Sequence, residues 1–425
     1  MKATTAAVLL AALVDNAIAE GVTGNTPQAR TPKANGKSFT LDQVENKNFK
    51  GHDGPMSFLR AHIKYAQKLP DYLSKVVEKN PALRLKFSLL APAGFQTGTV
   101  EAQPSEIADT EYSINVEIGT PPQIIPLNLD TGSADFWVFS TDTNPSMVNG
   151  QQLYDASKSS TSQFLPNETW GIKYGDNAQA SGNVYTDRVQ IGSTYVDKQA
   201  VQVATNVTED LTQDNFVSGI LGMANSAANT VRPTPQRTYI DNIKNDLALP
   251  LFTANLKRRA AGNYNFGYIN DLEYTGDIAY TPIDRTFPLW SVFTTGYKIG
   301  SSRHNASMSA IVDTGTSLLL LPEDVVSRYY AKVPGSGIEA DLGMVVFPCN
   351  ATLPDFHLLF NKYRGRVPGS YMNYGQISSR YCFGGLQSSA ALPFSVLGDV
   401  FLKAQFVVFD YGNAAVGFAN KDLGE

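Results

Sequence analysis

The sequence predicts an all-β body built as two similar halves, preceded by a shorter, basic and partly helical segment. Short apolar stretches separated by turn residues dominate from about Tyr112 onward, and long helical patterns are rare. The tripeptide Asp-Thr-Gly occurs at residues 130–132 and again at residues 313–315, each time after an apolar run. The two aspartates lie 183 residues apart, about the size of one domain.

The length and charge of the chain separate a basic segment from an acidic body. Its 425 residues suggest two or three domains. Residues 20–100 carry twelve Lys/Arg against six Asp/Glu, whereas residues 101–425 carry 21 against 32. A basic arm binds nucleic acid in some proteins. We expect an intramolecular partner instead, which is released when acid protonates the carboxylates of the body.

The first residues have the features of a secretory signal. Lys2 supplies the positive start, residues 6–14 the apolar run and residues 17–19 the small-residue cleavage site. The run is too short to span a bilayer, and no later stretch is long enough. A buried helix is the alternative structure, and the vacuole is the alternative destination to the exterior.

The cysteine and glycosylation patterns agree with export. Cys349 and Cys382 most simply form one disulfide in an exported chain, with two buried thiols as the alternative. Four asparagines are glycosylation candidates by pattern. They are Asn167, Asn206, Asn305 and Asn350.

A helical pattern precedes the body. Apolar residues recur at helical spacing within residues 55–69, and Lys64 and Tyr65 lie on that stretch. Residues 91–94 break the pattern, and residues 96–103 are interpreted as a linker.

The body is an imperfect internal duplication. An apolar pair before a glycine follows each Asp-Thr-Gly, with Gly222 lying 92 residues after Asp130 and Gly398 lying 85 residues after Asp313. We expect the two halves to meet near residues 268–281.

Each residue type of the repeated Asp-Thr-Gly tripeptide has an expected chemical role. Two carboxylates face to face can share one proton, so that one is the base and the other the acid toward a single water. Gly132 and Gly315 let backbone amides approach the carboxylates. Thr131 and Thr314 can bond across to the opposite loop.

The residues after each glycine complete this pattern. Ser133 and Thr316 can donate to the outer carboxylate oxygens. Ionising both carboxyl groups is unfavourable because their negative charges repel each other. The pKa of one is therefore lowered and that of the other raised, and the two pKa values describe the pair and not the individual residues. A single Asp-Thr-Gly is an ordinary turn, but two copies with duplicated surroundings are not.

Several stretches after Tyr112 resemble the pepsin-like aspartic endopeptidases, especially secreted fungal enzymes of the aspergillopepsin and penicillopepsin type. They are residues 118–123, 129–138, 170–184, 287–300, 311–322 and 397–402. The resemblance implies a bilobal fold of two pseudo-symmetric β-barrel lobes, with a long cleft between them and a hairpin flap over the aspartates.

The resemblance also implies roles for individual residues. Asp130 and Asp313 are expected to be catalytic, with Thr131, Thr314 and Trp137 in support. Substrate-binding and flap positions are Tyr174, Gly175, Asp176, Gly132, Gly315, Ser133, Thr316, Ile220 and Leu211. Lys64 is similar to a prosegment lysine that pairs with both aspartates, with Tyr65 beside it. The Cys349–Cys382 pair matches a disulfide of the C-terminal lobe.

Two positions depart from the family pattern. Ala178 lacks the hydroxyl that a serine usually supplies at the flap tip, which puts the acceptance of lysine before the cut in doubt. Asn128 is polar where an aliphatic residue is usual, which predicts a less apolar pocket.

Other chemistries have little support in the sequence. The four histidines are scattered without metal-ligand spacing, and there is no phosphate loop or sustained basic face on the body. We therefore expect no metal, cofactor, nucleic acid or membrane. Asp135 and Asp399 are interpreted as surface or loop hydrogen-bonding residues.

Together these observations predict a secreted, monomeric aspartic endopeptidase that cleaves extended polypeptides in acid and is made as a zymogen. The expected organisation is a signal peptide (1–19), a basic inhibitory propeptide (20–97), an N-terminal lobe with the flap (98–272) and a C-terminal lobe (273–425). A non-catalytic relative that keeps the fold as a binding module is the competing hypothesis.

Overall fold

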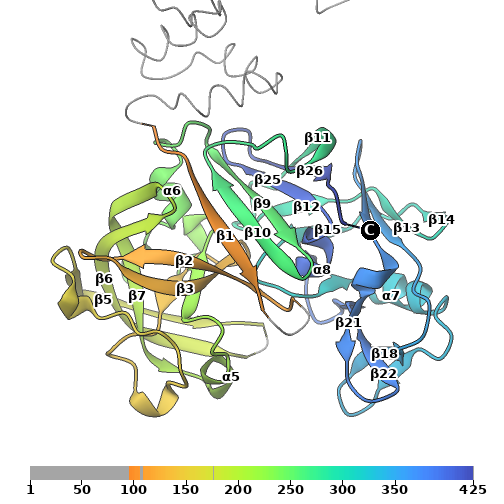
Figure 1. Ribbon diagram of the computed structural model, residues 1–425, viewed down its shortest axis with the longest axis horizontal. Helices are drawn as coiled ribbons and strands as arrows, with labels where there is room; N and C mark the ends of the chain where they lie inside the picture. The colour runs from red at the N-terminus through yellow and green to blue at the C-terminus, as the bar shows by residue number, and fades with distance from the viewer. Residues whose placement is uncertain (1–94, 106–108, 176, 425) are drawn as a thin grey trace, which may run out of the picture. The chain divides into compact units, whose positions relative to one another are not determined.

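The computed structural model describes residues 95–105, 109–175 and 177–424, all within one compact unit. The expected signal peptide, Lys64, Tyr65 and Asp176 lie outside the described residues, as does all of the expected propeptide except residues 95–97. The described residues are mostly β-strands with few short helices (Figure 1). The predicted all-β, two-lobed fold is therefore confirmed.

Six antiparallel strands form an inter-lobe sheet from both ends and the middle of the described chain. Their order is β11-β26-β25-β9-β10-β1. The strands are β1 (Gly98–Pro104), β9 (Leu251–Lys257), β10 (Ala260–Phe266), β11 (Thr275–Pro282), β25 (Phe406–Asp410) and β26 (Ala415–Asn420).

The N-terminal lobe continues from β1 in the order β2-β3-β8-β4-β7-β6-β5, and β2 also pairs with β6. Its strands are β2 (Tyr112–Ile118), β3 (Gln123–Asp130), β4 (Phe136–Val138), β5 (Gln163–Lys173), β6 (Gln179–Ile191), β7 (Thr194–Val207) and β8 (Gly219–Gly222). Its helical segments are η1 (Pro145–Met147), η2 (Ala156–Lys158), α5 (Glu209–Gln213), η3 (Ser226–Ala228) and α6 (Tyr239–Ile243).

The C-terminal lobe contains three smaller sheets, ordered β12-β15-β24-β16-β23, β14-β13-β19-β20 and β17-β18-β22-β21. Their strands are β12 (Ser291–Phe293), β13 (Gly296–Ile299), β14 (Ser302–His304), β15 (Ser309–Val312), β16 (Leu319–Leu321), β17 (Gly337–Glu339), β18 (Met344–Pro348), β19 (Phe356–Leu359), β20 (Arg364–Val367), β21 (Asn373–Gln376), β22 (Tyr381–Gly384), β23 (Leu386–Ser388) and β24 (Ser395–Leu397). Its helical segments are α7 (Glu323–Tyr330), η4 (Gly369–Met372) and α8 (Asp399–Leu402). A disulfide joins Cys349 to Cys382 of β22, as predicted.

The internal duplication is visible in strand pairing. β3, which ends at Asp130, runs parallel to β8, and β4 then pairs antiparallel with β8. In the other lobe β15 leads to Asp313 and runs parallel to β24, and β16 pairs antiparallel with β24. Each Asp-Thr-Gly strand therefore lies beside the strand of its downstream glycine element.

The linker interpretation of residues 96–103 is wrong for most of that stretch. Residues 98–104 form β1, which pairs with β10 on one side and β2 on the other. Val100 and Ala102 point inward and are buried, while Thr99 and Glu101 are exposed. The alternation is present in the sequence, but glycine and alanine at inward positions make its apolar signal weak.

Candidate active site

The main-chain position of Asp130 is determined by strand pairing with β8. Asp130 lies opposite Gly222 at the end of the parallel ladder. The backbone amide of Met223 donates to the Asp130 carbonyl over 2.7 Å. On the other side, the Asp313 amide donates to the carbonyl of Leu397 over 3.1 Å. The strand ends thus hold both aspartates by their main chains.

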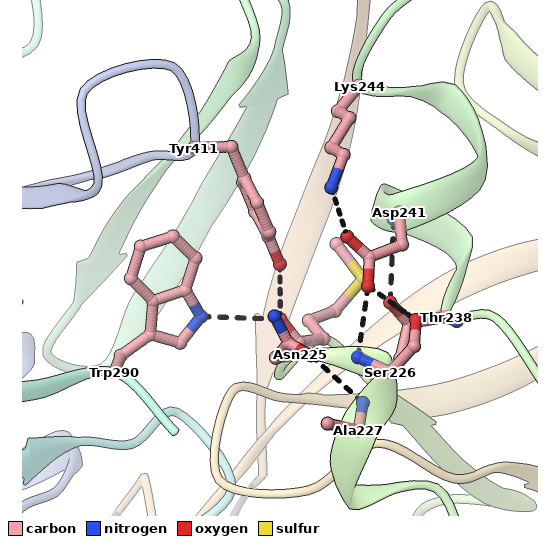
Figure 2. Close-up of polar contacts among 9 residues, drawn as sticks. Asn225, Ser226, Ala227, Thr238, Asp241, Lys244, Trp290 and Tyr411 are labelled. Atoms are coloured by element: carbon pink, nitrogen blue, oxygen red, sulfur yellow. Dashed lines mark hydrogen bonds and ion pairs between the residues drawn. The ribbon is translucent and has the colours of Figure 1, made fainter. Parts of the chain in front are cut away.

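The segment around Met223 is also bonded to residues of the other half of the chain (Figure 2). The Met223 carbonyl accepts hydrogen bonds from the Trp290 indole (3.3 Å) and the Tyr411 hydroxyl (2.9 Å). The residues that follow are held by Asp241 of α6, which accepts from the Ser226 amide (2.9 Å) and from Lys244 (2.6 Å). This junction makes the backbone beside Asp130 part of the contact between the halves.

Each aspartate carboxylate accepts the same pair of local donors. The Gly132 amide donates to one oxygen of Asp130 (2.7 Å), and the Ser133 hydroxyl donates to the other. In the second copy, the Gly315 amide donates to Asp313 (2.9 Å), and the Thr316 hydroxyl donates to its other oxygen (2.6 Å). The structure thus brings together the donors that the sequence predicts around each carboxylate.

The two Asp-Thr-Gly loops approach each other so closely that only glycine fits as the third residue of each tripeptide. A Cβ atom at Gly132 would lie 2.5 Å from the Asp313 carboxyl group. A Cβ atom at Gly315 would lie 2.2 Å from an Asp130 oxygen. Both distances are far below van der Waals contact, so a side chain at either position would push the two carboxyl groups apart.

Burial and the neighbouring Asp313 charge raise the pKa of Asp130 well above its ordinary value. Hydrogen bonds from Ser133 and Gly132 oppose this shift, whereas a hydrogen bond with the Asp313 carboxyl group adds to it. Both aspartates are only 6% exposed. The pair therefore holds one proton between its two carboxyl groups in conditions where an isolated aspartate would have lost it.

The threonines of the two tripeptides bond reciprocally across the lobes. The Thr131 hydroxyl donates to the Val312 carbonyl (2.8 Å), and the Thr314 hydroxyl donates to the Leu129 carbonyl (2.5 Å). Each hydroxyl also accepts from the backbone amide of the other threonine, at 3.2 and 3.0 Å. All of these groups are buried, so the two loops form one hydrogen-bonded unit.

Tyr174 lies at the end of the hairpin formed by β5 and β6. Its amide donates to the Ala178 carbonyl (2.9 Å), and its hydroxyl accepts from the Trp137 indole (2.8 Å). Asn177, near the hairpin tip, has a positive φ of 75°. Nothing lies within 4 Å of a Cβ built on Gly175, so this tip has free space. The predicted pairing of Tyr174 with Trp137 is present.

The two predicted pocket residues pack on one apolar cluster. Ile220 and Leu211 both contact the cluster that contains Trp137 and Phe139. Asn128 lies opposite Ile220 in the strand ladder, and its amide nitrogen donates to the Tyr112 carbonyl over 3.2 Å. The structure therefore places this polar residue directly beside the predicted pocket wall.

The sequence interpretation of Asp135 and Asp399 as surface or loop hydrogen-bonding residues is wrong as to the surface, although Asp135 is a hydrogen-bonding loop residue and Asp399 begins α8. Both are only 1% exposed. Asp135 accepts from Gln202 (2.8 Å) and from the amide and hydroxyl of Thr230. Burial raises the pKa of Asp399 well above its ordinary value, although the nearby Lys403 lowers it. A polar residue can be buried when the fold supplies its partners, and the partners of Asp135 are distant from it in sequence.

Two pairs of charged side chains, one buried and one partly buried, have no sequence motif. Lys403 and Asp109 lie 3.6 Å apart, and each is 4% or less exposed. Glu111 and Asp214 form a second hydrogen-bonded pair of carboxyl groups, whose members are 103 residues apart. Burial, followed by the charge of Asp214, raises the pKa of Glu111 to about 8. Only their proximity in the fold identifies these pairs.

The fold and the paired carboxyl groups define an aspartic peptidase, and comparison with known proteins agrees. Residues 111–421 match the family model for eukaryotic aspartyl proteases. The chain belongs to this family and is a pepsin-like aspartic endopeptidase.

Named relatives cover almost the whole chain. It is 42% identical to endothiapepsin of Cryphonectria parasitica, over 93% of each chain. It is 39% identical to aspergillopepsin-1 of Aspergillus pseudoglaucus, over 97% of this chain and 98% of that one. It is also similar in fold to the crystal structure of an aspartic proteinase from Irpex lacteus. That comparison has a TM-score of 0.65 and 24% identity, and covers 77% of this chain and 98% of the other.

Replacing Thr314 with valine is expected to destabilise the protein by about 2 kcal/mol, because it leaves the buried Thr131 amide and Leu129 carbonyl without a partner. Thr314→Ser keeps the hydroxyl and is the matched control. Chemical denaturation of both variants measures the difference. Equal stability of the two variants would contradict the proposed importance of the cross-lobe hydroxyl.

Replacing Glu111 with glutamine is expected to reduce the loss of stability between about pH 4.5 and pH 8. The folded protein keeps a proton on Glu111 that the unfolded chain has lost, so the free energy of unfolding falls as pH rises through this window. Glutamine imitates the protonated acid and removes that contribution. Thermal unfolding at several pH values measures it, with Glu101→Gln, a change at an exposed strand residue, as the control. A pH slope identical to that of the parent protein would refute the assignment.

Proposed function

We propose that this protein is a secreted endopeptidase, made as a zymogen, that hydrolyses internal peptide bonds of extended polypeptides in acid. The observation that carries the proposal is the buried pair Asp130 and Asp313, whose carboxyl groups meet between two equivalent loops and can share one proton. A water held between the carboxyl groups would lose a proton to the ionised aspartate as it attacks the peptide carbonyl. The protonated aspartate would donate to the carbonyl oxygen, and the shared protons would then serve the leaving amine.

The surrounding residues support substrate binding. Tyr174, Gly175 and Asp176 of the hairpin would cover the peptide and exclude bulk water. The backbones of Gly132 and Gly315, together with Ser133 and Thr316, would contact it beside the aspartates. Ile220 and Leu211 would form the apolar wall of the primary pocket. No step in this scheme requires a metal or an organic cofactor, and the enzyme would act as a monomer.

Acid dependence follows from the pair. The raised pKa of Asp130 means that one proton stays between the carboxyl groups in acid, and it is lost as pH rises through that pKa. A doubly ionised pair has no acid to protonate the carbonyl oxygen. The rate of hydrolysis would therefore fall toward neutral and alkaline pH.

Secretion and glycosylation have separate support. The signal pattern of residues 1–19 and the presence of a disulfide both suit export. All four sequon asparagines are exposed. Across the described part of the chain, no helix has the length and apolar character needed to cross a membrane. The vacuole remains the alternative destination.

The position of β1 inside the inter-lobe sheet limits where the propeptide can end. Residues 98–102 pair with β10 inside the inter-lobe sheet, and the Gln96 amide donates to the Asp246 carbonyl over 2.6 Å. A cut beyond residue 98 would remove strand pairs from this sheet. We therefore propose that propeptide removal ends at or before residue 97, with lobes of residues 98–272 and 273–425.

Asp130→Asn and Asp313→Asn are each expected to reduce peptide hydrolysis at least about 10³-fold, because the pair then lacks either its base or its shared proton. Assay of an unfolded protein substrate at about pH 4, with and without a pepstatin-type inhibitor, measures the change. Unfolding experiments should show that both variants remain folded. A folded variant with parental turnover would exclude the mechanism and favour a different active site.

Lys64→Met is expected to weaken latency near neutral pH, because the proposed ammonium can no longer pair with the two carboxyl groups. Mass spectrometry of the precursor after a shift to acid follows propeptide release, and peptide hydrolysis before the shift reports latency. Lys68→Met is a matched control within the same helical pattern. If both variants stay as inactive as the parent at neutral pH, Lys64 is not the inhibitory group. An intact precursor that stays inactive even after another protease removes the propeptide would favour the non-catalytic relative.

A further inference from the structure

A row of basic side chains crosses the outer sheet β14-β13-β19-β20. Strand register places Arg303 opposite Lys298, Lys298 opposite His357, and His357 opposite Arg366. Residues directly opposite each other in a sheet project from the same face. The row therefore uses one residue from each of the four strands and extends over the full width of the sheet.

The row lies on the face that points away from the core. The residues that alternate with it are apolar members of the main core cluster: Tyr297, Ile299, Phe356, Leu358 and Val367. Because successive side chains point to opposite faces, Lys298, His357 and Arg366 face outward. Arg364 lies two residues before Arg366 and therefore shares this face. These five residues, Arg303, Lys298, His357, Arg366 and Arg364, are called the basic row below.

His357 is the buried centre of the basic row. It is 8% exposed, and its Nδ1 atom has no hydrogen-bond partner among the described residues. Burial lowers the pKa of His357, and the charges of Arg364, Lys298 and Arg366 add to this effect, whereas Asp355 opposes it. The imidazole thus lies among cations and keeps a polar atom unused, which is an arrangement that an anion would relieve.

Among the described residues, the positive charge of the basic row is not matched by ion pairs at Lys298, Arg303 and Arg364, whereas Arg366 has an acidic partner. Asp355 is bonded to Arg366 (2.7 Å) and to the Gly369 amide (3.0 Å). Within the described ranges, Lys298, Arg303 and Arg364 form no ion pair. The rest of the body is acidic, since residues 101–425 carry 21 Lys/Arg against 32 Asp/Glu. A local excess of one sign on a body of the opposite sign indicates a charged partner.

The shape of the basic row favours a linear partner. Neighbouring strands lie about 4.8 Å apart, so the four side chains of the row lie at short, regular intervals over about 14 Å. β14 and β20 are the two edge strands of this sheet, so the row runs from one edge strand to the other. A long chain of regularly spaced anions can follow it, whereas a compact ion would contact only part of it.

A membrane surface fits less well. Interfacial binding requires exposed apolar side chains beside the cations. The large exposed apolar side chains of the described residues are on other segments, and none lies on β13, β14, β19 or β20. We propose that the basic row binds a linear polysaccharide that carries one carboxylate or sulfate group per sugar. This binding is independent of peptide hydrolysis.

Binding is tested on the wild-type protein at pH 5.5 by calorimetry. The probes are alginate oligosaccharides for carboxylates and dextran sulfate for sulfates, with neutral dextran as the blank. Binding to either anionic polymer but not to dextran, weakening as salt is raised, supports the proposal and identifies the preferred anion. The ¹³C-labelled His357 side chain should shift on binding and titrate at higher pH. Equal binding to dextran, or an unchanged His357 signal during binding, would overturn the proposal.

The double variant Lys298→Gln/Arg303→Gln should weaken binding at least tenfold while leaving hydrolysis of a short peptide unchanged. The matched control, Lys198→Gln/Arg380→Gln, removes the same charge from exposed residues outside the four strands. An equal loss in the control would show that net charge alone matters, which contradicts a site on the sheet. Tighter binding of poly-glutamate or of anionic lipid vesicles than of both polysaccharides would also overturn the proposal, in favour of an acidic protein or a membrane.

Discussion

The reciprocal hydrogen bonds of Thr131 and Thr314 are the constraint on which the rest of the site depends. They join the two Asp-Thr-Gly loops through buried hydroxyls and amides. Because each loop also positions its own aspartate through a glycine amide and a hydroxyl, the relative position of the carboxyl groups follows from this one junction. The raised pKa of Asp130 is a consequence, since it arises from burial and from the proximity of Asp313.

Features that repeat in the sequence were predictable. The two tripeptides, their downstream glycines and their apolar strands predicted paired lobes, and strand register confirms that β3–β8 and β15–β24 are equivalent. The Tyr174–Trp137 bond could be expected from the family resemblance. These features can be predicted because both of the segments that come together have a recognisable residue pattern.

Features that depend on distant partners were not predictable. Asp399 is the first residue of the short helix α8, and the burial of its carboxyl group is not evident from its sequence surroundings. Glu111 and Asp214 meet because β2 and the segment after α5 converge, although neither lies in a motif. The sequence does not predict β1 because some of its inward side chains are small. The strand forms because its backbone pairs with β10. For Glu111 and for β1 the missing information is a contact across a hundred residues or more.

The inter-lobe sheet also makes the fold depend on the last part of the chain to be synthesised. Its strands come from the first described residues, the middle of the chain and the last 20 residues. A nascent chain that has not yet reached β25 and β26 leaves β9 and β11 with unpaired edges. The sheet that joins the lobes then lacks two of its six strands. The inter-lobe sheet is thus complete only when the last 20 residues have joined it.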